Sequence, residues 1–197
     1  TTGNRRKSAT FFHQTAPICD EPLVRGLRRV EGPLSINPMV NAPPPFIPGA
    51  FVGAEHHYRA RVYFEDTDLS GIVYHANYLR YMERARSDML RIAGIDQRAA
   101  MDAGDGSWAV TDLSIKYRRP AKLDDDLLVV STVEAVRGAS VIIAQRILRG
   151  TDTLSGETLT DGHVTAAFLS PEGRPRRQPA GWADRFTAIM NGEKIPC

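Results

Sequence analysis

The stretch that most constrains this chain's fold runs from Arg61 to Gly94 and indicates a polar turn followed by one long helix. Asn77 is a typical N-cap residue, and Gly94 is a typical residue just beyond a helix end. A helix with a single apolar stripe must bury that stripe against another element. The stripe recurs with a helical period at Tyr78, Met82, Ala85, Met89 and Ala93.

The segments on both sides of this helix alternate with the period of two that is typical of β-strands. The first, Arg59 to Phe64, would place Ala60, Val62 and Phe64 on one buried face. After a short helical turn at 96–101, further strands are expected at 108–117, 127–136, 141–148 and 158–169. The pattern predicts an α+β fold in which a long central helix is wrapped by a five-stranded antiparallel sheet.

Composition divides the chain into three parts. Residues 1–57 contain eight of the 13 prolines and no sustained period, so a Pro-rich, disordered N-terminal extension is expected there. The folded domain is expected at 58–170 and a C-terminal tail at 171–197. A short amphipathic helix in that tail is indicated by Trp182, Phe186, Ile189 and Met190.

Two alternatives stay open for the extension. Its early basic residues suggest an organelle transit peptide, although three acidic residues before position 32 disfavour this interpretation. Residues 1–38 would instead be non-native if the biological start were Met39. Both cysteines, Cys19 and Cys197, are expected to be free thiols, because neither has metal-ligand spacing to a second Cys or a His.

Charge and hydropathy exclude several classes of protein. The first 50 residues carry six basic and three acidic side chains, and the rest of the chain carries 19 basic and 20 acidic ones. The expected domain therefore lacks the positive surplus of a nucleic-acid-binding protein. No apolar run reaches the length of a membrane span, and we expect a cytoplasmic protein.

The segment Glu65 to Arg86, EDTDLSGIVYHANYLRYMERAR, closely resembles the signature of the hotdog-fold acyl-CoA thioesterases of the 4-hydroxybenzoyl-CoA thioesterase class. Within that class it resembles the bacterial subgroup associated with the Tol-Pal envelope system. The stretch YRRPAKLDDDLLV at 117–129 is similar to the family's strand-turn-strand segment. This resemblance covers residues 58–170. It implies a hotdog fold, hydrolysis of acyl-CoA without metal or cofactor, and a homodimer or homotetramer with active sites at the subunit interface.

The resemblance also implies roles for individual residues. Asp68 would be the catalytic carboxylate, acting on water or as a nucleophile. His75 would act as an orienting group or as a hydrogen-bond donor. The residue types suit this chemistry, since an aspartate with a reference pKa of about 3.9 is ionised at neutral pH. A helix N-terminus near His75 offers unpaired N–H groups to a developing oxyanion.

Each candidate also has a simpler interpretation. An aspartate before a helix usually caps or stabilises a turn, and this is the role expected for Asp66. Tyr74 and Asn77 could contact substrate or could provide packing and an N-cap. Phe64 is a departure, because the subgroup usually has a tyrosine at this substrate-site position.

Basic residues near the expected strand ends are candidates for binding the CoA phosphates. One group is Arg118 and Arg119 with Lys116; the other is Arg174, Arg176 and Arg177. An acyl carrier protein is an alternative carrier of the substrate. A calcium loop beginning at Asp66 is disfavoured, because its twelfth position is Asn77 where a glutamate is expected.

Two other functions remain open at the level of the sequence. The domain could be a non-catalytic module that binds acyl carriers or envelope-complex partners. It could also be another hotdog enzyme, such as a 3-hydroxyacyl dehydratase, whose acid and base would be His75 and Glu83.

Overall fold

The computed structural model describes residues 49–151 and 156–195, all within the compact unit Pro45–Cys197. The expectations for residues 1–48, including Cys19 and a start at Met39, lie outside the described residues. The same holds for Cys197. No helix of the described part is long and apolar enough to cross a membrane.

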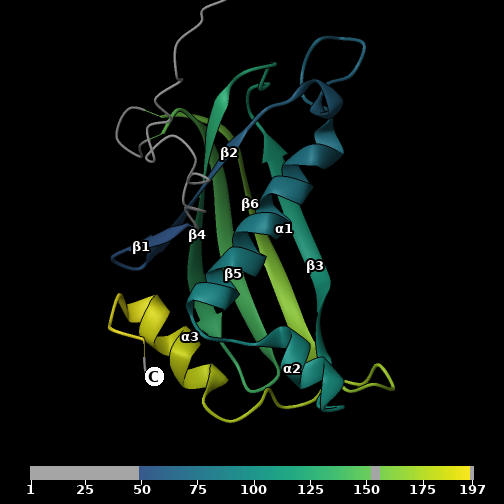
Figure 1. Ribbon diagram of the computed structural model, residues 1–197, viewed down its shortest axis with the longest axis vertical. Helices are drawn as coiled ribbons and strands as arrows, with labels where there is room; N and C mark the ends of the chain where they lie inside the picture. Colours follow the sequence, from purple (N-terminus) through teal and green to yellow (C-terminus); the bar gives the residue numbers. More distant parts are fainter. Residues whose placement is uncertain (1–48, 152–155, 196–197) are drawn as a thin grey trace, which may run out of the picture. The chain divides into compact units, whose positions relative to one another are not determined.

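One six-stranded antiparallel sheet forms the frame of the fold (Figure 1). Its spatial order is β1-β2-β4-β5-β6-β3, so β3 occupies one edge and the short β1 the other. The strands are β1 (Ala50–Val52), β2 (Glu55–Arg61), β3 (Ser107–Tyr117), β4 (Asp126–Val136), β5 (Ser140–Arg149) and β6 (Glu157–Leu169). The predicted α+β hotdog fold is confirmed, and β1 adds a sixth strand that pairs with β2.

The long central helix, α1 (His75–Ile92), lies across one face of this sheet (Figure 1). Its 18 residues span about 27 Å at the usual rise of an α-helix. The predicted stripe is buried, with Tyr78, Met82, Ala85 and Met89 at most 3% exposed. Gly94 follows the helix with φ +70, a left-handed conformation that suits glycine, as predicted.

Three local expectations differ from the structure. The N-cap position is occupied by Tyr74, whose side chain makes no capping hydrogen bond, and Asn77 lies in the first turn and is buried. The strand before the turn ends at Arg61, and Phe64 begins a 3₁₀ turn, η1 (Phe64–Asp66), where it is 81% exposed. Phe64 therefore does not share the buried face of Val62. The expected domain start at Tyr58 falls inside β2.

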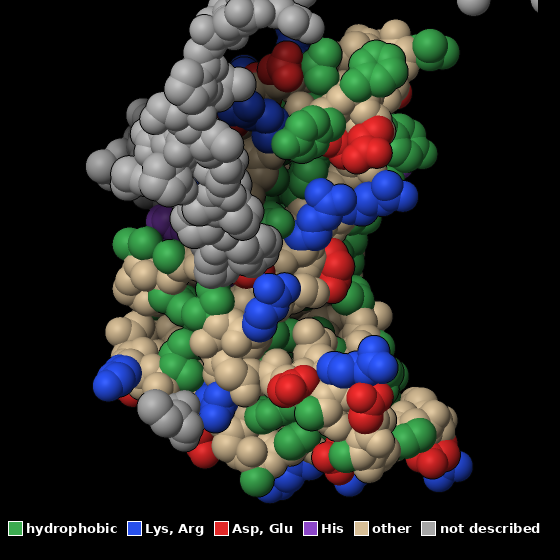
Figure 2. Space-filling view, viewed as in Figure 1, with side chains coloured by type: hydrophobic (Ala, Val, Ile, Leu, Met, Phe, Trp, Pro, Cys, Tyr) green, Lys and Arg blue, Asp and Glu red, His purple; other side chains and the backbone are tan. Residues whose placement is uncertain are grey.

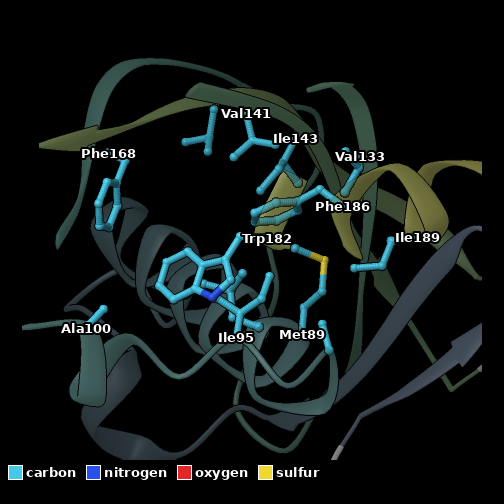
Figure 3. Packing of buried hydrophobic residues seen from close by; sticks show 13 residues of the cluster. Met89, Ile95, Ala100, Val133, Val141, Ile143, Phe168, Trp182, Phe186 and Ile189 are labelled. Carbon is cyan, nitrogen blue, oxygen red and sulfur yellow. The ribbon is translucent and has the colours of Figure 1, made fainter. Parts of the chain in front are cut away.

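The C-terminal helix, α3 (Trp182–Asn191), packs into the core with the second half of α1. Its Trp182, Phe186 and Ile189 are buried in the same cluster as Met89. Figure 3 shows Phe186 beside Ile143 and Trp182 in this cluster. The amphipathic helix expected from these residues is present, and it contributes core side chains to the folded unit. The remaining helix is α2 (Gln97–Asp102).

Candidate active site

The 66–74 turn that precedes α1 is anchored by Asp66. The buried Asp66 carboxylate accepts a hydrogen bond from the Tyr63 N–H at 2.9 Å. The backbone carbonyl of Asp66 accepts two further hydrogen bonds at 2.9 Å, one from the Tyr74 N–H and one from the Asn77 side-chain amide. The turn-stabilising role expected for Asp66 agrees with these contacts. Asn77, whose amide points to this carbonyl, fixes the turn to the first turn of α1.

Asp68 lies at the exposed tip of the 66–74 turn. Its carboxylate accepts hydrogen bonds from the Ser70 hydroxyl and from the Ser70 N–H, the latter at 2.8 Å. Gly71 closes the turn with φ +74 and donates its N–H to the Asp68 carbonyl at 2.9 Å. The Ser70 hydroxyl, then the Ser70 N–H, and then the nearby charge of His75 hold the pKa of Asp68 below its usual value. Asp68 is therefore ionised at neutral pH.

The N-terminus of α1 begins just after this turn. No side chain caps it, and the N–H groups of His75 and Ala76 have no hydrogen-bond acceptor among the described residues. The positive end of the helix dipole adds to their capacity to bind a negative oxygen. The Asp68 N–H donates to the Ile72 carbonyl at 3.0 Å, so the turn folds back towards the residues that lead into α1.

Aromatic rings surround His75. Its exposed imidazole packs against the Tyr74 ring at a centroid separation of 4.3 Å and faces the Tyr117 ring at 6.3 Å. The Tyr117 hydroxyl donates a hydrogen bond to the His75 carbonyl at 3.0 Å. Tyr117 ends β3, so this contact ties the start of α1 to the end of the edge strand.

A cavity of about 290 Å³, the α1-start cavity, opens between the first turn of α1 and the end of β3. It brings three of the predicted site residues together, His75, Arg118 and Arg119. The other lining residues are Ile72, Val73, Tyr78, Tyr117 and Pro120. A larger hollow of about 540 Å³ lies at the opposite end of α1 and includes neither Asp68 nor His75 among its lining residues.

Both arginines of the α1-start cavity are paired with carboxylates. Arg118 forms an ion pair with Asp161 of β6, and Arg119 forms one with Glu157 at 2.8 Å. Of the alternative basic cluster, Arg176 contacts the carbonyl of Asp105 at 2.6 Å, next to the start of β3 instead of its end. Within one chain, the two basic groups therefore lie at opposite ends of β3.

Several residues that the sequence predicts for the site do not lie together in the structure. Phe64 is 81% exposed and does not line the α1-start cavity, and Tyr74 contributes through its stacking on His75. His75 and Glu83 are eight residues apart on one helix, about 12 Å along its axis, so one chain does not place them at the same substrate carbon. No group of three His, Cys, Asp or Glu side chains in the described part of the chain could hold a metal ion.

Sequence reasoning missed Tyr78 and Tyr117 as site residues. In the sequence, Tyr78 is one more apolar residue of the buried stripe. Tyr117 is the last residue of a strand with an alternating pattern. The signal for Tyr117 was its place directly before the Arg118-Arg119-Pro120 stop, at the strand end nearest the start of α1.

A single helix wrapped by an antiparallel sheet, with an aspartate turn at the helix N-terminus, defines a hotdog-fold protein. Residues 70–155 match the thioesterase superfamily model. The acyl-CoA thioesterase YbgC of Haemophilus influenzae is 38% identical over 125 residues, which cover 64% of this chain and 92% of that protein. The acyl-CoA thioester hydrolase YbgC of Escherichia coli is also 38% identical, over 91% of its length and 64% of this chain.

A solved structure supports the same assignment. The probable thioesterase from Bartonella henselae is 36% identical, with a TM-score of 0.54 over 64% of this chain and 98% of that one. The chain belongs to the YbgC family of acyl-CoA thioesterases, within the thioesterase superfamily.

Proposed function

We propose that this chain hydrolyses acyl-CoA thioesters and that Asp68 is its catalytic carboxylate. The observation that carries this proposal is the turn that holds Asp68 just before the N-terminus of α1, folded back by the hydrogen bond from the Asp68 N–H to the Ile72 carbonyl at 3.0 Å. A thioester carbonyl needs both a base or nucleophile at its carbon and donors at its oxygen. The 66–74 turn and the start of α1 supply these two parts side by side.

The reaction can follow either of two balanced courses. In the first, Asp68 takes a proton from a water molecule while the water oxygen attacks the carbonyl carbon. In the second, Asp68 attacks directly, and water then cleaves the resulting anhydride. In both, the carbonyl oxygen is stabilised by the N–H groups near His75, the C–S bond breaks, and the thiolate of CoA leaves and is protonated.

In this account, the rate of hydrolysis should begin to fall only at low pH. Because the hydrogen bonds from Ser70 lower the pKa of Asp68, the carboxylate stays ionised across the physiological range. His75 then serves as a hydrogen-bond donor or orienting group, and its exposed imidazole can reach substrate.

A homodimer is part of this proposal, formed through the free edge of β3. One side of β3 pairs with β6 along its whole length, whereas its other side has no partner strand among the described residues. The strand carries half-exposed apolar side chains, Val110, Leu113 and Tyr117. Figure 2 shows further hydrophobic side chains gathered around the start of α1. An unpaired edge of this kind is a template for pairing with a second copy.

Arg118 and Arg119 are the candidates for the CoA phosphates, because both line the α1-start cavity. Each already pairs with a carboxylate, so phosphate binding would exchange one ion pair for another. Their contribution to affinity is therefore expected to be modest and strongly dependent on salt.

The test is the release of free thiol from a panel of acyl-CoA esters by the wild type and by Asp68→Asn. The variant should lose about a hundredfold or more in kcat while retaining its circular dichroism spectrum. Asp96→Asn is the matched control, because Asp96 caps α2 on the exposed surface and should leave the rate within about twofold. A folded wild type that releases no thiol from any ester would overturn the proposal.

A further inference from the structure

The first turn of α1 has no side-chain cap, but two contacts from other parts of the fold hold it in place. One is the hydrogen bond from the Asn77 amide to the Asp66 carbonyl. The other comes from the end of β3, which lies beside the start of α1 (Figure 1), where the Tyr117 hydroxyl donates to the His75 carbonyl at 3.0 Å. Because helix ends fray when nothing binds them, these contacts keep the N–H groups of the first turn in fixed positions.

The Tyr117 contact acts on one particular peptide group. The carbonyl of His75 and the N–H of Ala76 belong to the same planar unit, because the peptide bond has partial double-bond character. The Ala76 N–H has no hydrogen-bond acceptor among the described residues. A donor at the carbonyl polarises the peptide, and hydrogen bonds linked in this way strengthen one another by roughly 10–30%. Tyr117 therefore orients the Ala76 N–H and also makes it a stronger donor.

The side chain of Tyr117 is held firmly enough for this role. Its ring packs edge-on against the Tyr78 ring at a centroid separation of 5.6 Å, and it meets the His75 imidazole at 6.3 Å. The backbone of Tyr117 is fixed by the pairing of β3 with β6, where it lies opposite Thr160. Burial raises the pKa of the Tyr117 hydroxyl, so this group keeps its proton and remains a donor across the physiological range.

The peptide that Tyr117 holds lies at the wall of the α1-start cavity, because both His75 and Tyr117 line that cavity. Stabilisation of a developing oxyanion depends on donors that are aimed before the reaction begins. Removal of one such donor lowers kcat by about 10²–10³-fold. Loss of a residue that only aims the donor should lower kcat by less.

We infer that Tyr117 is a positioning residue for thioester hydrolysis, which acts through the His75 carbonyl to orient and polarise the Ala76 N–H towards the thioester oxygen. This inference rests on the proposed function, in which the N–H groups at the start of α1 stabilise that oxygen. Tyr117 takes no part in bond formation or proton transfer, so both balanced courses of the reaction are unchanged.

The first experiment compares the kinetics of butyryl-CoA hydrolysis in the wild type, Tyr117→Phe and Tyr58→Phe. Tyr117→Phe removes the hydroxyl and keeps the ring, so kcat should fall about tenfold while KM changes less than about twofold, as expected for an interaction made in the transition state. The matched control is Tyr58→Phe, because Tyr58 lies in β2 and does not line the α1-start cavity. Both constants should stay within about twofold in the control.

Infrared spectroscopy of a bound ester distinguishes this role from a merely structural one. The probe is butyryl-CoA with ¹³C at the thioester carbonyl, bound to Asp68→Asn, which slows its hydrolysis. Hydrogen bonds to the carbonyl oxygen lower its stretching frequency, so binding should shift the band to lower wavenumber. The shift should be smaller when Tyr117→Phe is added. A cavity that is only loosened would bind the ester more weakly and leave the frequency of the bound ester unchanged.

The spectra also separate failure of this inference from failure of the proposed function. If the wild type releases no thiol but the shift appears and depends on Tyr117, the hydrolase proposal falls and the role of Tyr117 at the oxygen-binding N–H stands. If hydrolysis depends on Asp68 but Tyr117→Phe leaves kcat unchanged, the inference is overturned and the proposed function stands. A shift that is absent, or that Tyr117→Phe leaves unchanged, would overturn the inference as well.

Discussion

The hydroxyl of Tyr78 accepts a hydrogen bond from the backbone N–H of Ala121 at 2.7 Å. The carbonyl of Ala121 accepts another from the Val73 N–H at 2.9 Å. The backbone of one buried residue, Ala121, therefore joins the first turn of α1 to the end of the 66–74 turn. This contact fixes the wall of the α1-start cavity relative to the helix N-terminus.

Tyr78→Phe should weaken both stability and catalysis. The substitution leaves the buried Ala121 N–H without an acceptor, which costs about 1–3 kcal/mol of unfolding free energy. It also loosens the wall of the α1-start cavity, so kcat should fall more than KM rises. Urea unfolding and steady-state kinetics measure the two effects.

Tyr117→Phe is the control for this prediction. Tyr117 is 46% exposed and donates to a carbonyl that solvent can reach, so its loss should cost under about 1 kcal/mol. Equal losses of stability in the two variants would show that the Ala121 contact has no special importance.

The buried pair of His56 and Asp88 should make stability depend on pH. His56 is 0% exposed, and its Nε2 lies 3.0 Å from the Asp88 carboxylate, which also accepts the Gly49 N–H at 2.7 Å. Burial lowers the pKa of His56 despite the opposing effect of Asp88. The unfolded chain then binds more protons below about pH 6.5, so unfolding free energy should fall with pH from there towards the folded-state pKa.

NMR and urea unfolding test this dependence. The ring resonance of His56 should titrate at a lower pH than a free imidazole does in the folded protein, because burial lowers its pKa. His56→Gln should reduce the pH slope of stability in this window, whereas His163→Gln, on an exposed side chain, should not. A full titration of the His56 resonance near pH 6.5 would contradict the prediction.

Leu113→Glu should prevent formation of the proposed homodimer. Leu113 is 38% exposed near the middle of β3, so two-fold pairing through the free edge of β3 would bring the two introduced carboxylates close together, and their repulsion would disfavour association. Sedimentation should show monomers at micromolar concentration with at least tenfold lower activity. Val52→Glu places the same charge on the opposite edge of the sheet, where Val52 is 57% exposed, and should leave the dimer intact.

The long elements of the fold could be predicted because their periods repeat over many residues. The stripe from Tyr78 to Met89 and the alternation of β3 each specify a buried face several times over. Asn77 was expected to cap the helix on residue type alone, but its amide serves a tertiary contact with the Asp66 carbonyl. The sequence does not show which of these two roles Asn77 takes, because the tertiary contact depends on how the 66–74 turn folds against α1.

The site was only partly predictable for a related reason. Asp68 and His75 lie within eight residues of each other, so one local pattern contains both. Tyr117 comes from a distant segment, and only the sheet register brings it to the α1-start cavity. Phe64 was placed on a strand that ends three residues earlier, at Arg61.

The most direct test of the central claim is the pH dependence of kcat/KM for butyryl-CoA from about pH 4.5 to 8. If Asp68 is the catalytic carboxylate, its lowered pKa predicts a rate that stays level to about pH 5 in the wild type, and a rate at least about a hundredfold lower in Asp68→Asn throughout. A wild-type rate that halves near about pH 6.5, where an imidazole titrates, together with an active Asp68→Asn, would contradict the account and assign the base to a histidine.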